Sequence, residues 1–270
     1  MKMLFVGATG NIGRRVVPFL KPDFDLILAA KGGGEVCGLP VQDVDLTNWE
    51  STLDLVAQSG ADVLVNCAIQ NYQNPDGTDQ DWRDADVMRS YHAGAIDVNI
   101  KGAFHLYEAA KSAKVKRVIY ISSMTIVLAD ATGQLRDAIG AHPPEFPYDI
   151  YACAKHCGEE MARVYTLAKD VPLDVACLRL GQPYPTDTAR KWAVDTPHKR
   201  GLALAHGDTA GAIAAAARAS FQGFGVFQIV SNADENWVDL SVARALGYEP
   251  KFTFEADGLR APDGTLEAYQ

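Results

Sequence analysis

The amino-acid sequence predicts an α/β fold built on a doubly wound, mostly parallel sheet. Continuous apolar runs recur along the chain, helical segments separate them, and a glycine-rich turn joins the first run to the first helix. Parallel strands are buried on both faces, so they form unbroken runs of Val, Ile and Leu rather than alternating patterns. A glycine-rich turn at this position is typical of a Rossmann-type domain. We therefore expect one domain over residues 1–270, with a small C-terminal substrate-binding cap from about residue 181.

Composition and charge narrow the functional classes. At 48% hydrophobic and 22% charged residues, the chain can bury a full core. The net charge of −9 argues against nucleic acid as a partner. No apolar run approaches the roughly 20 residues that cross a bilayer, and the first strand begins too early for a cleavable signal, so we expect a cytoplasmic protein. The five cysteines are too scattered for a disulfide scaffold, and we expect no metal site.

The first third of the chain alternates strands and helices. Short runs rich in Val, Ile and Leu predict strands, and the longer segments between them predict helices. Pro18 predicts a kink or an early end of the first helix. Lys31 begins a glycine-rich loop. The expected strands cover residues 3–6, 24–30, 41–44 and 61–67, and the expected helices cover residues 11–20 and 48–59.

The remainder continues the pattern and then changes character. Residues 70–86 form a polar, acidic segment that we expect to be a solvated insertion. Residues 181–200 are rich in Pro, Thr and basic residues, which is typical of a substrate-side loop. The expected helices cover residues 90–114, 148–169, 208–221 and 239–246, and the expected strands cover residues 117–122, 173–180 and 225–230.

The first strand–helix junction carries the strongest local motif. Its glycines allow a tight turn and let the backbone approach a pyrophosphate, whose charge then lies at a helix N-terminus. Because glycine also occurs in ordinary turns, the position between strand and helix is what favours a dinucleotide site. The predicted cofactor-binding residues of this turn are Gly7, Thr9, Gly10, Asn11, Ile12 and Gly13.

Two later strand ends agree with a dinucleotide site. Asp45 and Leu46 follow a short strand, where the carboxylate could accept a hydrogen bond from an adenine amino group. Cys67 and Ala68 close the next strand, where the small Ala68 would let a ribose approach. Each pair also fits an ordinary helix start or a buried strand end.

A tyrosine and a lysine four residues apart, Tyr151 and Lys155, begin a predicted helix and share one face of it. An ammonium group beside a phenol favours the phenolate, so we expect the lysine to lower the pKa of Tyr151. The pair is therefore a candidate for acid–base chemistry on a substrate hydroxyl or carbonyl while a nicotinamide cofactor exchanges hydride.

Taken together, these motifs resemble the extended short-chain dehydrogenase/reductase superfamily, within the NAD-dependent epimerase/dehydratase family. The resemblance covers nearly the whole chain and implies an NAD(P)-dependent enzyme on a Rossmann-type fold that forms a homodimer in many members. It rests on residues 7–13, 45–46, 66–68, 97–102 and 122–123, and on Tyr151 with Lys155.

The resemblance also implies roles for individual residues. Tyr151 would be the catalytic acid–base, Lys155 would contact the nicotinamide ribose, and Asn99 would support a proton relay. A serine after the strand would orient the substrate, and Ser123 is the expected residue. Many members carry this Ser or Thr one residue later, where this chain has Met124, so Ser122 and Thr125 remain alternatives.

The length and the C-terminal segment are similar to those of uronate dehydrogenases, which oxidise the anomeric carbon of a hexuronic acid to a lactone. In that group an arginine of the loop after the Arg-x-Gly strand end holds the substrate carboxylate, and Arg190 or its neighbour Lys191 falls near that position. Uronate dehydrogenases have an Asn-His pair after the two serines, whereas this chain has Met124 and Thr125. This difference weakens the case for a uronate substrate.

The choice between NAD and NADP depends on the end of the second strand. NAD-binding domains carry an acidic residue there, about 20 residues beyond the glycine motif. This chain has Lys31 instead, which would attract a 2′-phosphate with help from Arg14 or Arg15. Glu35 could fold back over the glycine loop and restore NAD binding. The residues slightly favour NADP.

The leading hypothesis is an oxidoreductase that acts on a hydroxyl or carbonyl group of a small sugar-like substrate, such as a uronate. A second hypothesis is a sugar epimerase or dehydratase that reduces its cofactor only transiently. A third is a non-catalytic dinucleotide-binding regulator, although such members of the superfamily often lack the Tyr/Lys pair that this chain retains.

Overall fold

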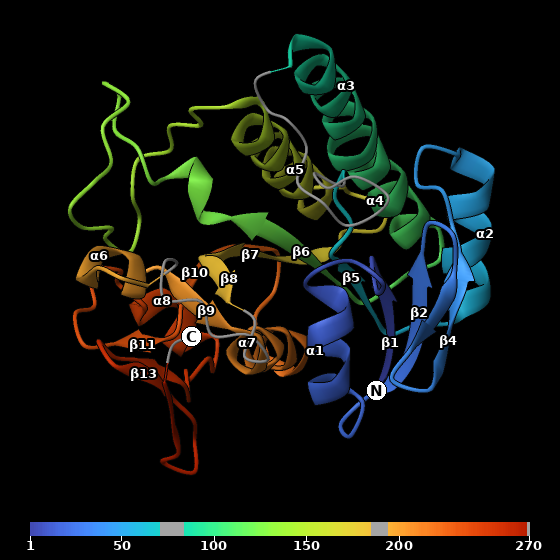
Figure 1. Ribbon diagram of the computed structural model, residues 1–270. Coiled ribbons are helices and arrows are strands. Elements are labelled where there is room, and N and C mark those ends of the chain that lie inside the picture. The colour runs from blue at the N-terminus through green and yellow to red at the C-terminus, as the bar shows by residue number, and fades with distance from the viewer. Residues whose placement is uncertain (71–83, 185–193, 269–270) are drawn as a thin grey trace.

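The computed structural model describes residues 1–70, 84–184 and 194–268. Its centre is an eight-stranded sheet in the order β10-β7-β6-β5-β1-β2-β4-β3, in which every neighbouring pair is parallel except β3 with β4 (Figure 1). The sheet comprises β1 (Lys2–Val6), β2 (Asp25–Ala30), β3 (Gly34–Val36), β4 (Leu39–Asp43), β5 (Val63–Asn66), β6 (Arg117–Ser123), β7 (Asp174–Leu180) and β10 (Phe224–Ile229).

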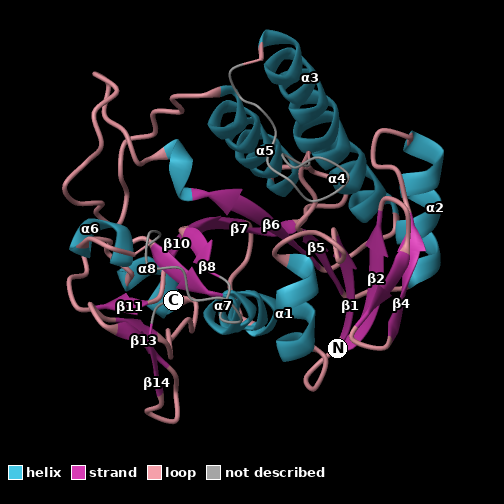
Figure 2. Ribbon diagram, in the orientation of Figure 1, coloured by secondary structure: helices cyan, strands magenta, loops and turns pink. Residues whose placement is uncertain are grey.

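Helices cover both faces of this sheet, as Figure 2 shows. The helices α2 (Trp49–Ser59), α4 (Gly102–Ser112) and α5 (Ile150–Thr166) bury one face, with Leu55, Leu106 and Ala162 in the shared core. The helices α1 (Gly13–Leu20), α7 (His206–Arg218) and α8 (Ser241–Ala245) bury the other. The predicted doubly wound α/β fold is therefore confirmed.

Local sequence fixes the ends of the helices that carry the site. The Asn48 side chain accepts a hydrogen bond from Ser51 N at 2.9 Å at the start of α2, and Gly60 ends that helix with a φ of 55°. The Asp149 side chain accepts one from Ala152 N at 2.6 Å at the start of α5. This cap defines where the first turn of α5, which bears Tyr151, begins.

The C-terminal third adds two small sheets beside the main one. The first pairs β8 (Gln182–Tyr184) with β9 (Ala203–Ala205), and α6 (Pro197–Arg200) lies between them in the chain. The second comprises β11 (Asn232–Ala233), β12 (Thr253–Phe254), β13 (Gly258–Arg260) and β14 (Leu266–Ala268). These strands are only two or three residues long, which is too short for the pattern of apolar residues to predict them.

Two local features differ from expectation, and a third, Pro18 near the end of α1, agrees with it. The loop expected after Lys31 includes β3, which forms an antiparallel hairpin with β4 and places Glu35 opposite Pro40. The long helix expected over residues 90–114 is instead α3 (Ala85–Ala95), the π-helix η1 (Ile96–Lys101) and α4. Pro18 lies inside α1, which ends two residues later at Leu20. None of the helices among the described residues is both long and apolar enough to span a membrane.

Candidate active site

The glycine-rich turn lies where β1 and β5 adjoin at the centre of the sheet, the point at which the strand order reverses. Gly7 has a φ of 93°, and a Cβ there would lie 2.7 Å from Ala68 N. A Cβ at Gly13 would overlap the carbonyl oxygen of Gly7. At Gly10, in contrast, the nearest atom would be Gly7 O at 3.1 Å. Gly7 and Gly13 therefore allow backbone packing, whereas a Cβ at Gly10 would make a single tight contact, with Gly7 O.

The N-terminus of α1 opens onto this turn without a side-chain cap. Ile12 occupies the cap position and makes no side-chain hydrogen bond, and the first turn carries no acidic residue. Arg14 and Arg15 donate to Asn11 Oδ1 at 3.0 and 2.8 Å. The helix end and the two guanidinium groups favour an anion here, as a pyrophosphate requires.

Two of the predicted cofactor-binding residues, Lys31 and Asp45, form a salt bridge with each other. Lys31 Nζ lies 2.9 Å from Asp45 Oδ2, and this hydrogen bond lowers the pKa of Asp45 to about 2. Gly32 N donates to Asp43 Oδ1 at 2.6 Å. The Thr9 methyl group lies 3.9 Å from where a Gly34 Cβ would stand, so the two glycine loops adjoin.

Leu46 contributes to the site through its backbone and packing. His105 Nδ1 lies 2.7 Å from Leu46 O, and a Cβ at Gly102 would lie 3.0 Å from Leu46 Cβ. These contacts hold the segment after β4 against α4. Leu46 itself is buried, so its side chain packs in the core of the protein.

The end of β5 brings Cys67 and Ala68 beside the catalytic candidates. Ala68 N donates to Asn66 Oδ1 at 3.2 Å. Burial raises the pKa of the Cys67 thiol to about 12, while the nearby charge of Lys155 acts in the opposite direction. Cys67 is thus a neutral, buried neighbour of the lysine.

Tyr151, Ser123 and Thr125 converge at the carboxyl ends of the strands. The Tyr151 hydroxyl lies close enough to Ser123 for the serine hydroxyl to act on its pKa, and Thr125 Oγ1 donates to Ser123 Oγ at 2.9 Å. Ser122 points elsewhere, because its Oγ donates to Glu159 Oε1 at 2.6 Å. The sequence left three hydroxyl groups as candidates for the substrate contact. Those of Ser123 and Thr125 lie near Tyr151, and that of Ser122 does not.

Lys155 lies beneath this group, and its effect on Tyr151 differs from expectation. Its ammonium group is 6.0 Å from the centroid of the tyrosine ring and donates to Ile121 O at 2.7 Å. Burial raises the pKa of Tyr151 above its usual value. The prediction that Lys155 lowers this pKa is therefore wrong. Burial also lowers the pKa of Lys155 to about 8.

Asn99 comes from the π-helix η1, which packs against α5. Its Oδ1 accepts a hydrogen bond from Gln70 N at 2.9 Å, and its buried Nδ2 has no hydrogen-bond partner within the described parts of the chain. A buried donor without a partner is uncommon and indicates a place for a water or ligand. Single-turn π-helices occur frequently at functional sites.

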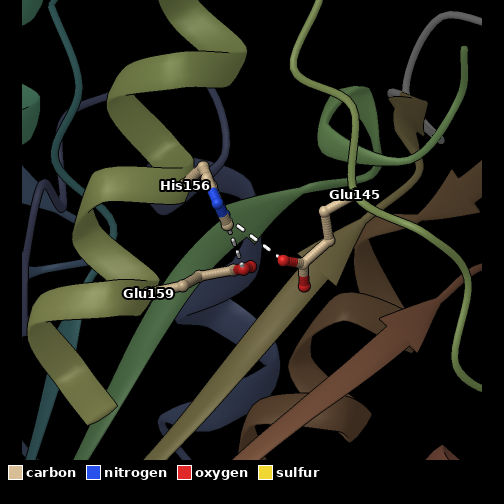
Figure 3. A group of neighbouring side chains, drawn as sticks. All are labelled: Glu145, His156 and Glu159. Atoms are coloured by element: carbon tan, nitrogen blue, oxygen red, sulfur yellow. Dashed lines mark ion pairs between the residues drawn. The ribbon is translucent and has the colours of Figure 1, made fainter. Parts of the chain in front are cut away.

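A partly buried ionic cluster below the site was not predicted. Arg179 Nε and Nη2 donate to the two oxygens of Glu159 at 2.9 and 2.6 Å, and Nη2 also donates to Glu145. His156 Nδ1 lies 3.7 Å from Glu145 Oε2 and 3.9 Å from Glu159 Oε2 (Figure 3). The available signal was Arg179 itself, a charge inside the apolar run that follows Asp174 in β7.

Three side chains of this cluster, those of Glu145, His156 and Glu159, offer metal-ligand atoms within 4.8 Å of one another. Because Arg179 already donates to both carboxylates, the geometry is that of an ion-pair network. The five cysteines are free thiols. Arg190 and Lys191, the predicted carboxylate-binding residues, lie outside the described residues.

The model of the NAD dependent epimerase/dehydratase family matches residues 3–191. The chain belongs to this family. The L-arabinose 1-dehydrogenase (NAD(P)(+)) of Haloferax volcanii is 26% identical over 265 residues, which cover 93% of this chain and 96% of that protein. The uronate dehydrogenase of Pseudomonas syringae pv. tomato is 26% identical, over all of this chain and 91% of that protein.

Solved structures of the family have the same fold. The uronate dehydrogenase from Agrobacterium tumefaciens superposes with a TM-score of 0.71 at 24% identity, covering 94% of this chain and 85% of that chain. The glucuronic acid dehydrogenase from Chromohalobacter salexigens gives a TM-score of 0.73 at 21% identity, covering 95% and 86%. These structures confirm the fold, and the family model confirms the family predicted from the sequence motifs.

Proposed function

We propose that this protein is an NAD(P)-dependent dehydrogenase that oxidises a hydroxyl group of a small free sugar or sugar acid. The observation that carries the proposal is the convergence of Tyr151, Ser123, Thr125 and Lys155 beside the glycine-rich turn. A proton-transfer group, hydroxyl groups to hold a substrate oxygen and a dinucleotide site then share one edge of the sheet.

The turn has the features that a dinucleotide requires. A Cβ at Gly10 would have one neighbour within 4 Å, Gly7 O, and α1 begins just after the turn with no side-chain cap. Asp45, Cys67 and Ala68 would line the adenosine and nicotinamide sides. When bound, the cofactor supplies the acceptor for a hydride.

The chain's own residues handle the proton. Ser123 and Thr125 would hold the substrate oxygen by hydrogen bonds, and Tyr151 would take its proton during oxidation or return it during reduction. The unpartnered Nδ2 of Asn99 would bind a water that carries the proton onward. Lys155 would contact the nicotinamide ribose and supply positive charge near the phenol.

The named relatives support a monosaccharide or its uronic acid as the substrate class, since one acts on L-arabinose and another on uronates. For a carboxylated sugar we assign the carboxylate to Arg190, because a guanidinium group pairs with a carboxylate in a planar, bidentate geometry. Residues 181–270 would supply this substrate side of a single domain. A cytoplasmic location stays a prediction from the sequence.

We further propose a homodimer in which the outer surfaces of η1, α4 and α5 meet. Ile96, Phe104 and Val164 are 51%, 44% and 67% exposed there, and these elements lie together on one side of the sheet (Figure 1). Val164→Asp should halve the mass measured by light scattering. Leu266→Asp, which changes an exposed leucine on β14, should not. A monomeric wild-type protein would contradict this proposal.

The activity is tested by a screen of free aldoses, including L-arabinose, and of uronates with NAD⁺ and with NADP⁺. A dehydrogenase accumulates reduced nicotinamide in proportion to the sugar consumed. Sugar conversion without net reduction of the cofactor would show an epimerase or dehydratase instead. Dinucleotide binding without any conversion would support a regulator and exclude the proposed reaction.

A further inference from the structure

One carboxylate below the site connects three elements of the fold. Glu159 lies on α5 and is 1% exposed. Its oxygens accept hydrogen bonds from Ser122 Oγ on β6 at 2.6 Å and from Arg179 Nε and Nη2 on β7 at 2.9 and 2.6 Å. Ser122 and Arg179 are each 2% exposed, so water does not compete for these bonds.

The partners of Glu159 are the immediate neighbours of the proposed catalytic residues. Ser122 precedes Ser123, and Glu159 follows Lys155 by four residues, or about one helical turn. Lys155 bonds in turn to Ile121 O, the residue before Ser122, at 2.7 Å. Two consecutive residues of β6 are thus tied to two successive turns of α5. These two attachments set the height and the rotation of the helix above the strand.

We infer that Glu159 is a positioning residue, which acts through Ser122 and Arg179 to hold Ser123 and Lys155 in register with Tyr151. The inference rests on the proposed dehydrogenase function. Arg179 extends the same network to Glu145, in the segment that leads into α5. The hydrogen bonds support this role, because three donors fix the orientation of a buried carboxylate, whereas a carboxylate without donors can rotate.

Glu159→Gln tests the role, with Glu160→Gln as the matched control. Glu160 is the next residue on the helix, is half exposed and forms an ion pair with Arg163. For Glu159→Gln we expect kcat about ten- to a hundred-fold lower, as a small displacement of reacting groups causes, with the substrate KM and the dinucleotide Kd nearly unchanged. The control should keep wild-type values.

The pH profile separates positioning from bulk stability. Burial lowers the pKa of Lys155 to about 8, and the charge of Glu159 acts to raise it. Removing that charge should move the alkaline fall of kcat/KM to lower pH, whereas a loss of folded protein would scale the whole profile without moving it. An unmoved profile with wild-type kcat would overturn the inference.

Ser122→Ala keeps the inference testable if Glu159→Gln does not fold. It removes one hydrogen bond and should lower kcat about two- to tenfold. A crystal structure of either variant supplies a readout that needs no substrate. We expect the contact between Tyr151 and Ser123 to lengthen, and an unchanged contact would overturn the inference. If the wild-type enzyme converts no sugar, the proposed function fails, while this structural comparison still decides the role of Glu159.

Discussion

Burial and hydrogen bonding act in opposite directions on the Tyr151 phenol. Burial raises its pKa, and the hydrogen bond with Ser123 acts to lower it. With the net shift upward, the phenol is protonated at neutral pH, which suits proton donation to a carbonyl. Oxidation of a hydroxyl group needs the phenolate instead. The oxidative rate should therefore rise as the pH increases above neutrality, up to the alkaline fall that deprotonation of Lys155 produces.

Tyr151→Phe removes the proton carrier and leaves the ring in place. We expect kcat to fall by about 10²- to 10⁴-fold, the usual contribution of a general acid–base group. Dinucleotide affinity, measured by calorimetry, should stay near wild type, because no predicted cofactor contact is lost. Tyr148→Phe, which changes an exposed tyrosine just before α5, is the control. Unchanged turnover in Tyr151→Phe would refute the proposed acid–base role.

The pair of Lys31 with Asp45 bears on cofactor choice. Its salt bridge in the structure is partly exposed, so a 2′-phosphate could displace the carboxylate at low cost. Lys31→Asp should weaken NADP⁺ binding about tenfold or more, which corresponds to about 1.4 kcal/mol. Asp45→Asn should not weaken it, because the substitution frees the lysine. Tighter binding of NAD⁺ than of NADP⁺ by the wild type, or no change in Lys31→Asp, would count against this preference.

At the scale of single elements, the sequence predicted most strands and helices but not the π-helix. Apolar runs locate β1, β5, β6 and β7 because buried parallel strands need them. The segment around Asn99 has ordinary helical composition, so nothing in it shows that an extra residue is accommodated in one turn. That turn is set by packing against α5, which a local pattern does not contain.

Two glycines at the start of the chain have different roles: we expect Gly13 to matter for folding and Gly10 for cofactor binding. Gly10→Val should abolish dinucleotide binding and leave the circular dichroism spectrum folded, because a Cβ there would have only Gly7 O within 4 Å and the side chain would stand where a pyrophosphate approaches the backbone. Gly13→Ala should instead lower the free energy of unfolding by about 1–3 kcal/mol or more, because its Cβ would overlap Gly7 O. Calorimetry and urea unfolding distinguish the two. Normal cofactor affinity in Gly10→Val would mean that the phosphates bind elsewhere.

At the scale of the whole molecule, the contacts that escaped prediction are those between distant segments. Tyr151 and Lys155 share a helix, so their spacing alone places them together. The bonds from Glu159 to Ser122 and Arg179 join residues 37 and 20 positions apart. Strand and helix order brings such residues near one another, but the rotation of α5 over the sheet decides which side chains meet. Only the three-dimensional structure shows that rotation.

The same cluster predicts how global stability depends on pH. The carboxylates of Glu159 and then Glu145 raise the pKa of His156 above its usual value, with Glu160 adding to the effect and Arg179 balancing part of the negative charge. The folded protein therefore binds this proton more tightly than the unfolded chain does. The stabilisation is fully present below the unfolded-state pKa of about 6.5 and is lost as the pH rises through the folded-state pKa.

Urea unfolding from about pH 6 to pH 8 should show wild type losing stability relative to His156→Gln. His142→Gln, at an exposed position, should follow the wild type. If the difference in the free energy of unfolding between wild type and His156→Gln stayed constant across this range, the pKa of His156 would not change on folding, and the prediction would be wrong.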